Sequence, residues 1–150
     1  MEEKILQAIR TIADNPNKIS SVYRIRKEQE YTRYYFLYNE RFVWSVEKLE
    51  DDDFFDVNDT LLASKAYTAT YYPGASIDDI TRDFELAHAK KSVDELTYTP
   101  SLLKSEEALS IFDDLYRKVN ELYFGFERIL DEIIDHSKEN EQNGLSTDHH

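Results

Sequence analysis

The sequence predicts an α+β fold: an N-terminal helix, a three-stranded antiparallel meander that a fourth strand can extend, a middle helix, and a long C-terminal helix packed on the sheet. Two observations predict it. The stretch 31–48, YTRYYFLYNERFVWSVEK, is rich in aromatic residues and alternates as strands do. Between residues 109 and 133, apolar residues recur at spacings of three and four, which is the period of a helix.

The first two elements follow from periodicity. Residues 3–14 place apolar side chains at helical spacing, and Asn15-Pro16 supplies a stop signal. In SSVYRIRK, which follows, Tyr23 and Ile25 alternate with Arg24 and Arg26, the pattern of a half-buried strand. The sequence therefore begins with an amphipathic helix that leads into a strand.

The register of the meander can be argued from loop parity. A two-residue loop at Asn39-Glu40, or a four-residue loop, places Leu37 opposite Phe42 and so Tyr35 opposite Trp44. We favour the longer loop, because a two-residue type I′ turn needs positive φ at both central residues and glutamate resists it. A three-residue loop at 28–30 places Tyr23 opposite Tyr35.

This register sorts the side chains onto two faces. The predicted core face carries Tyr23, Ile25, Tyr35, Leu37, Phe42, Trp44 and Val46. The second face carries Val22, Arg24, Arg26, Thr32, Tyr34, Phe36, Tyr38, Arg41, Val43, Ser45 and Glu47. Two interpretations of the second face stay open: a partner-binding surface, because interfaces favour tyrosine and arginine, or a face covered by a helix of the same chain, such as 77–91.

The middle of the chain gives mixed signals. Residues 49–60 form a charge-rich connection, and 61–66 could extend a short helix, whereas 67–72 is typical of a strand ending at Pro73-Gly74. Ser76 with Asp79 resembles a capping box that opens a helix running to about residue 91. The following SVDELTYT is a loop or a short strand.

The clearest pattern is the C-terminal helix, expected over residues 100–136. Its apolar positions are Leu109, Phe112, Tyr116, Val119, Tyr123, Phe126, Leu130 and Ile133, widened by Leu115, Leu122 and Ile129. At 1.5 Å per residue it would be roughly 55 Å long, more than a small domain easily covers. It therefore either bends at Gly125 or packs against a partner's helix in a homodimer. Residues 1–136 form the predicted domain, and 137–150 a disordered polar tail in which the origin of His149-His150 is open.

Composition excludes several classes of function. The net charge is -13, and residues 51–150 hold nine basic and twenty-three acidic residues. Such a charge repels nucleic acid and anionic membranes, so neither is an expected partner. The expected partner is a basic protein. Without cysteine, a signal peptide or a long apolar run, a cytoplasmic location is predicted. The three glycines are far apart, which excludes phosphate loops, and an EF-hand starting at Asp56 fails because Leu61 occupies the glycine position. No metal or cofactor is expected.

Three functional hypotheses remain. The first is an acidic protein-binding module that inhibits or neutralises a more basic protein, as immunity proteins, antitoxins and phage inhibitors do. Its predicted partner-binding residues are Asp51, Asp52, Asp53, Asp56, Arg24, Arg26, Tyr34, Phe36, Tyr38 and Arg41. The alternative is a dimeric secretion or assembly chaperone that pairs through the C-terminal helix. An enzyme whose site is assembled only in space is the third, and the missing motifs favour a binding protein over it.

Overall fold

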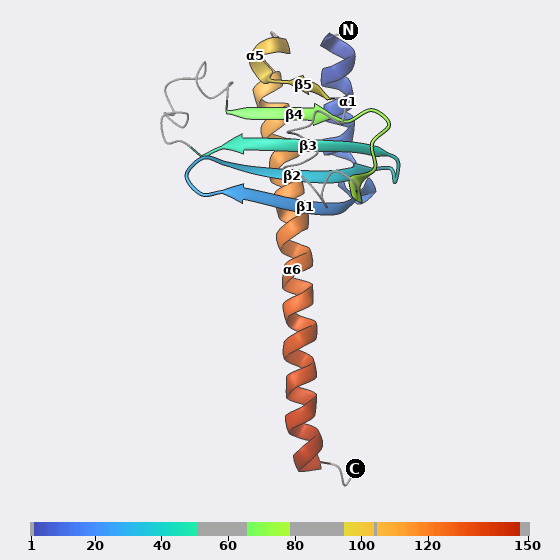
Figure 1. Ribbon diagram of the computed structural model, residues 1–150, viewed down its shortest axis with the longest axis vertical. Helices are drawn as coiled ribbons and strands as arrows, with labels where there is room; N and C mark the ends of the chain where they lie inside the picture. Colours follow the sequence, from blue (N-terminus) through green and yellow to red (C-terminus); the bar gives the residue numbers. More distant parts are fainter. Residues whose placement is uncertain (1, 51–65, 79–94, 104, 148–150) are drawn as a thin grey trace.

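The computed structural model describes residues 2–50, 66–78, 95–103 and 105–147, with side chains as far as Ser137 (Figure 1). The elements follow in this order: α1 (Glu2–Asp14), the 3-10 helix η1 (Pro16–Lys18), β1 (Ile19–Lys27), β2 (Tyr31–Tyr38), β3 (Phe42–Leu49), β4 (Tyr67–Tyr71), β5 (Leu96–Tyr98), α5 (Pro100–Leu103) and α6 (Ala108–Thr147). The predicted α+β class is confirmed.

The five strands form one antiparallel sheet in the order β1-β2-β3-β4-β5. Helices α1 and α6 contact each other, and α6 also contacts β1, β3 and β4. Figure 1 shows α6 crossing the strands and continuing well beyond β1, the strand at one edge of the sheet. The fourth strand expected at 67–72 is present as β4, and the SVDELTYT stretch contributes the short strand β5.

The register between β1 and β2 is confirmed, whereas the register between β2 and β3 is wrong by one residue. Tyr35 pairs with Ser45, not Trp44. Asn39 and Glu40 both have positive φ, 54° and 58°, and the Arg41 amide donates to the Tyr38 carbonyl at 3.2 Å. The ladder resumes only at residue 42, so the loop has three residues, and an odd loop exchanges the faces of the following strand.

The helix-covered face of the sheet is therefore a mixture of the two predicted sets. Buried side chains from the strands here are Ile19, Tyr34, Phe36, Trp44, Val46, Tyr67 and Ala69. Those from the helices are Ile9, Ile12, Ala13, Leu103, Ala108, Ile111, Phe112, Leu115 and Val119. Tyr35, expected in this core, instead lies in a smaller cluster on the opposite face with Val43, Tyr72 and Ile77. The main core thus lies between the sheet and the pair α1 and α6.

The C-terminal helix differs from prediction at both ends. The expected continuous helix from residue 100 is divided into α5 and α6, and the Ser105 hydroxyl accepts a hydrogen bond from the Glu107 amide just before α6 begins. At the other end, α6 runs past residue 136 to Thr147, through part of the predicted tail, so its 40 residues span about 60 Å. Gly125 does not interrupt it.

Two predictions fall outside the described residues. The choice between helix and strand for 61–65 cannot be read from the structure, and of the helix expected over 77–91 only Ile77 and Asp78 are described, both helical. Among the described residues, no helix combines the length and apolarity needed to cross a membrane.

Candidate protein-binding surface on α6

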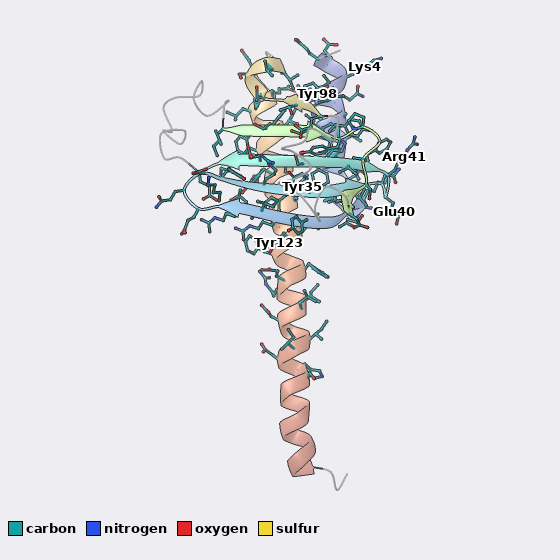
Figure 2. The ribbon with its side chains drawn as sticks, in the orientation of Figure 1. Lys4, Tyr35, Glu40, Arg41, Tyr98 and Tyr123 are labelled. Carbon is teal, nitrogen blue, oxygen red and sulfur yellow. The ribbon has the colours of Figure 1, made fainter. Side chains whose placement is uncertain are left out.

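Helix α6 has two parts with different surroundings. In residues 108–123, the side chains of Phe112, Leu115 and Val119 have no exposed area. From residue 126 to Ser137, every side chain is exposed. Figure 2 shows these outer side chains projecting from a helix with no strand beside it. The outer part of α6 therefore has no cover from the described part of the chain.

Five large apolar side chains share one face of this outer part. Their exposed fractions are Phe126 62%, Ile129 53%, Leu130 42%, Ile133 60% and Ile134 52%. At 3.6 residues per turn, spacings of three and four align side chains along a helix, so these five form a single stripe. We call it the outer α6 surface. Contiguous exposed apolar area of this kind on a folded protein usually marks a binding site.

Acidic residues occupy the rest of the outer helix. Between residues 121 and 136 the sequence has five carboxylates and one basic residue, Arg128. The carboxylates belong to Glu121, Glu127, Asp131, Glu132 and Asp135, all of them on exposed residues. Helical spacing places Glu127 and Glu132 on the two flanks of the apolar stripe and the others farther round. The outer α6 surface is thus an apolar strip bordered by negative charge.

A groove opens beside the inner end of this surface. It has a volume of about 530 Å³, and its lining is Pro16 together with Lys118, Glu121, Leu122, Gly125, Phe126 and Ile129 of α6. A Cβ built on Gly125 would meet no atom within 4 Å. The packing of this chain therefore does not require glycine at residue 125, although glycine is the least favourable residue in a helix after proline.

Where α6 leaves the sheet, two of its own aromatic rings contact an arginine of β1. The guanidinium carbon of Arg24, on β1, lies 5.5 Å from the ring centroid of Tyr123 and 5.1 Å from that of Phe124. The Tyr123 hydroxyl donates to Glu127 at 2.8 Å, which is the main reason that the pKa of Tyr123 is raised. Figure 2 labels Tyr123 at the position where α6 passes β1.

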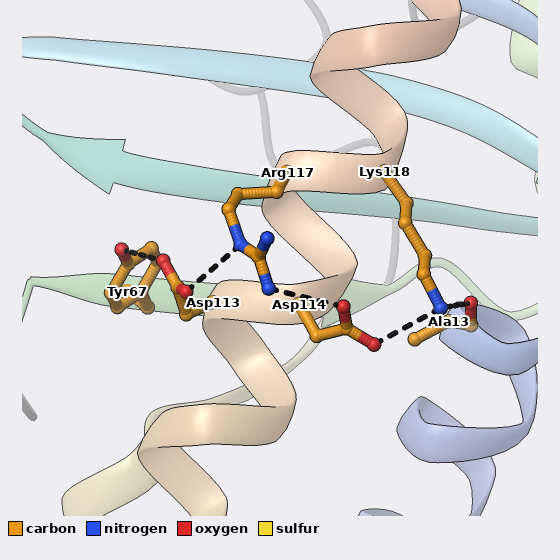
Figure 3. Close-up of polar contacts among 6 residues, drawn as sticks. All are labelled: Ala13, Tyr67, Asp113, Asp114, Arg117 and Lys118. Carbon is orange, nitrogen blue, oxygen red and sulfur yellow. Dashed lines mark hydrogen bonds and ion pairs between the residues drawn. The ribbon is translucent and has the colours of Figure 1, made fainter.

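Polar contacts hold the inner part of α6 on both sides (Figure 3). The Tyr67 hydroxyl of β4 donates to Asp113 at 2.5 Å. Arg117 bridges Asp113 and Asp114 at 3.1 and 3.3 Å. Lys118 reaches the Ala13 carbonyl of α1 at 2.6 Å. Burial, with the neighbouring carboxylate second, raises the pKa of Tyr67.

Two of the predicted partner-binding residues are interior. Tyr34 and Phe36 have no exposed area. The Tyr34 hydroxyl donates to the Asn120 side chain of α6, and burial raises the pKa of Tyr34 to about 12. The interpretation that helices of the same chain cover this face is the one that the structure supports, with α1 and α6 as the cover.

The other predicted residues differ in their surroundings. Arg26 is exposed and pairs with Glu50 at 3.0 Å. This contact raises the pKa of Arg26 and lowers the pKa of Glu50. Arg41 is exposed, with its guanidinium carbon 5.1 Å from the Phe42 ring centroid. Tyr38 is half-buried. The acidic residues Asp51, Asp52, Asp53 and Asp56 lie outside the described residues.

The outer α6 surface is contained in the sequence pattern, which left open a bend at Gly125 or packing against a partner's helix. Phe126, Leu130 and Ile133 belong to the same regular spacing as Phe112 and Val119, so periodicity alone does not distinguish them. The signal that separates them is length, because a helix of this size exceeds what a small sheet covers. Comparisons with family models, curated proteins and solved structures found no match to this chain.

Proposed function

We propose that this chain is an acidic protein-binding module that docks on a more basic protein through the outer α6 surface, and so blocks or escorts it. The observation that supports this proposal most strongly is the stripe of five apolar side chains, 42–62% exposed, on a helix that projects from the domain. Leaving such area in water costs free energy, roughly 25 cal/mol for each Å² of apolar surface, which a bound partner recovers.

Charge selects the kind of partner. Five carboxylates and a single basic residue occupy residues 121–136, so a partner with lysine or arginine around an apolar patch gains attraction at both flanks of the stripe. A partner with the same acidic borders meets repulsion instead. The excess of negative charge over the whole chain, -13, also accelerates the encounter with a basic protein.

Shape indicates how the partner binds. A straight helix with one apolar face is the geometry that packs against an apolar helix of a partner, which contributes side chains at positions i, i+3, i+4 and i+7. The groove at Gly125 offers a recess in which one of those side chains can approach the α6 backbone. The partner we expect is therefore a basic protein that presents an amphipathic helix.

The test uses two synthetic peptides with leucine at heptad core positions, one with lysine and one with glutamate at all other positions. Fluorescence anisotropy measures their binding to the full chain at low and high salt. We expect the lysine peptide to bind, with affinity falling as salt rises, and the glutamate peptide not to bind. Equal binding of both peptides, or of neither, would contradict the proposal.

A matched pair of variants locates the contact. Phe126 lies in the apolar stripe, whereas Phe124 lies about 160° round the helix, beside Arg24. Phe126→Ala should weaken binding of the lysine peptide by about tenfold, more than 1 kcal/mol, as for a central interface residue. Phe124→Ala should change the affinity less than threefold. If the two variants weaken binding equally, the apolar stripe is not the docking surface.

A second candidate, the chaperone-type homodimer, rests on a different observation. Residues 16–27 hold four basic residues and no acidic one, and β1 within them is an edge strand next to the point where α6 leaves the sheet. In a two-fold pair, the acidic outer helix of each copy could therefore face the basic edge of the other. Sedimentation equilibrium decides: a stable dimer that Phe126→Ala dissociates would favour this candidate, and a monomer would exclude it.

A further inference from the structure

An open cavity of about 500 Å³ lies between α1 and the sheet. Its sheet side is an aromatic wall formed by Tyr38, Phe42, Trp44 and Tyr71 of β2, β3 and β4. The centroids of the Trp44 and Tyr71 rings are 5.2 Å apart, and those of Phe42 and Tyr71 are 6.4 Å apart. A cavity of this size is within the range of small-molecule sites, roughly 300–1,000 Å³.

The helix side of the cavity is formed by Lys4, Gln7, Ala8, Thr11 and Ile12 of α1. Of these, Ala8 and Thr11 have short side chains and are exposed. The Thr11 hydroxyl donates back to the Gln7 carbonyl at 2.7 Å, so it is held against its own helix. A larger residue at position 8 would fill the space between α1 and the rings.

One charged residue lines the cavity, and it is cationic. Lys4, in the first turns of α1, forms no ion pair within the described part of the chain (Figure 2). None of the described residues that line the cavity is a carboxylate, although the chain as a whole carries a net charge of -13. The described lining thus combines aromatic rings of the sheet with one cationic residue of α1.

We propose that this cavity binds a small aromatic carboxylate, with the ring of the ligand against Trp44 and Tyr71 and its carboxylate directed to Lys4. Aromatic rings favour tilted or offset contact with other rings, which the aromatic wall offers. The ammonium of Lys4 supplies a charge-assisted hydrogen bond. The cavity shares no lining residue with the groove at Gly125, so this site is independent of the docking surface on α6.

The single tryptophan of the chain makes the test direct. The probes are 2-naphthylacetate and its neutral analogue 2-(2-naphthyl)ethanol, titrated into the full chain while the one indole N–H resonance of Trp44 is followed by NMR. We expect a saturable shift with the acid and a roughly two- to fivefold weaker affinity for the alcohol, the range for one partly exposed ionic contact.

Variants check the two halves of the site. Lys4→Gln should lower the affinity for the acid to that for the alcohol, whereas Lys18→Gln, an exposed lysine outside the cavity, should change neither. Ala8→Phe should abolish binding of both probes, with circular dichroism to verify the fold. No saturable Trp44 shift, equal affinity for acid and alcohol, or unchanged binding in Lys4→Gln would each overturn the proposal.

Discussion

The inner and outer parts of α6 are similar in sequence pattern and opposite in environment. Leu115 is fully buried, whereas Leu130, two heptads and one residue further along, is 42% exposed. Both parts have apolar residues at spacings of three and four, and both have carboxylates on the remaining positions. The difference shows that periodicity predicts which face of a helix is buried but not which molecule buries it.

The largest expected effect is a difference in the free energy of unfolding between substitutions in the inner and in the outer part of α6. Leu115→Ala should lower the free energy of unfolding by about 2–5 kcal/mol, because it removes buried methyl groups and leaves a cavity. Leu130→Ala makes the same chemical change on an exposed site and should lower it by no more than about 0.5 kcal/mol. Urea denaturation followed by circular dichroism measures both.

A large loss in Leu130→Ala would show that the outer part is already packed in solution. The same measurement at two protein concentrations then identifies the cover: a loss that shrinks on dilution indicates a second copy, because the stabilisation that a dimer adds falls with protomer concentration.

The next effect is a loss of folding stability as the pH rises above 10. The pKa of Tyr34, beneath the inner part of α6, is raised to about 12 by burial, while an unfolded tyrosine titrates near about 10. Between these values the unfolded chain releases a proton that the folded chain keeps, so stability falls as pH rises. Stability relative to Tyr34→Phe should fall by about 1 kcal/mol from pH 10 to 11, because one pKa unit corresponds to about 1.4 kcal/mol.

Urea unfolding of both proteins at several pH values measures this difference, and the absolute stability of either protein need not be known. A constant difference across that range would mean that Tyr34 titrates normally and that the inner part of α6 does not seal it from water.

The smallest effect tests the boundary between the two parts. Gly125→Ala should stabilise the fold by about 0.8–1.0 kcal/mol, because alanine is the better helix former and its Cβ meets nothing within 4 Å. The same methyl group enters the groove, so binding of the lysine peptide should weaken. Thermal unfolding and anisotropy measure the two results. A variant with unchanged binding would separate the groove from the docking surface.

Most of the fold follows from the sequence, and its main error has a local cause. The loop at 28–30 was correctly predicted as three residues, so the β1–β2 register was right. At the next loop, the two lengths considered were both even and gave the same pairing. The structure has an odd loop, with Glu40 at positive φ despite its side chain. The surrounding packing outweighs that local preference, because only this register places Tyr34 and Phe36 beside Trp44 and Val46 under the helices.

The candidate site was less predictable for a different physical reason. Exposure of Phe126 and Ile133 depends on how far the sheet extends along α6, and the width of a sheet is a tertiary property. The cavity beside Trp44 depends on the distance between α1 and three strands, which no local pattern encodes. The sequence predicted partner-binding residues from their chemistry, among them Tyr34, Phe36 and the arginines of β1. In the structure, Tyr34 and Phe36 are buried in the core.

The projecting helix also determines how the molecule moves in solution. The outer part of α6, residues 126–147, is a rod of about 33 Å attached to a small domain and increases friction with water, so the chain should diffuse more slowly than a compact sphere of 17.8 kDa. Gel filtration should therefore give an apparent mass above the true one even for a monomer. Rotation about the helix axis should be faster than end-over-end tumbling, and amides in α6 should relax differently in NMR from those in the strands that it crosses.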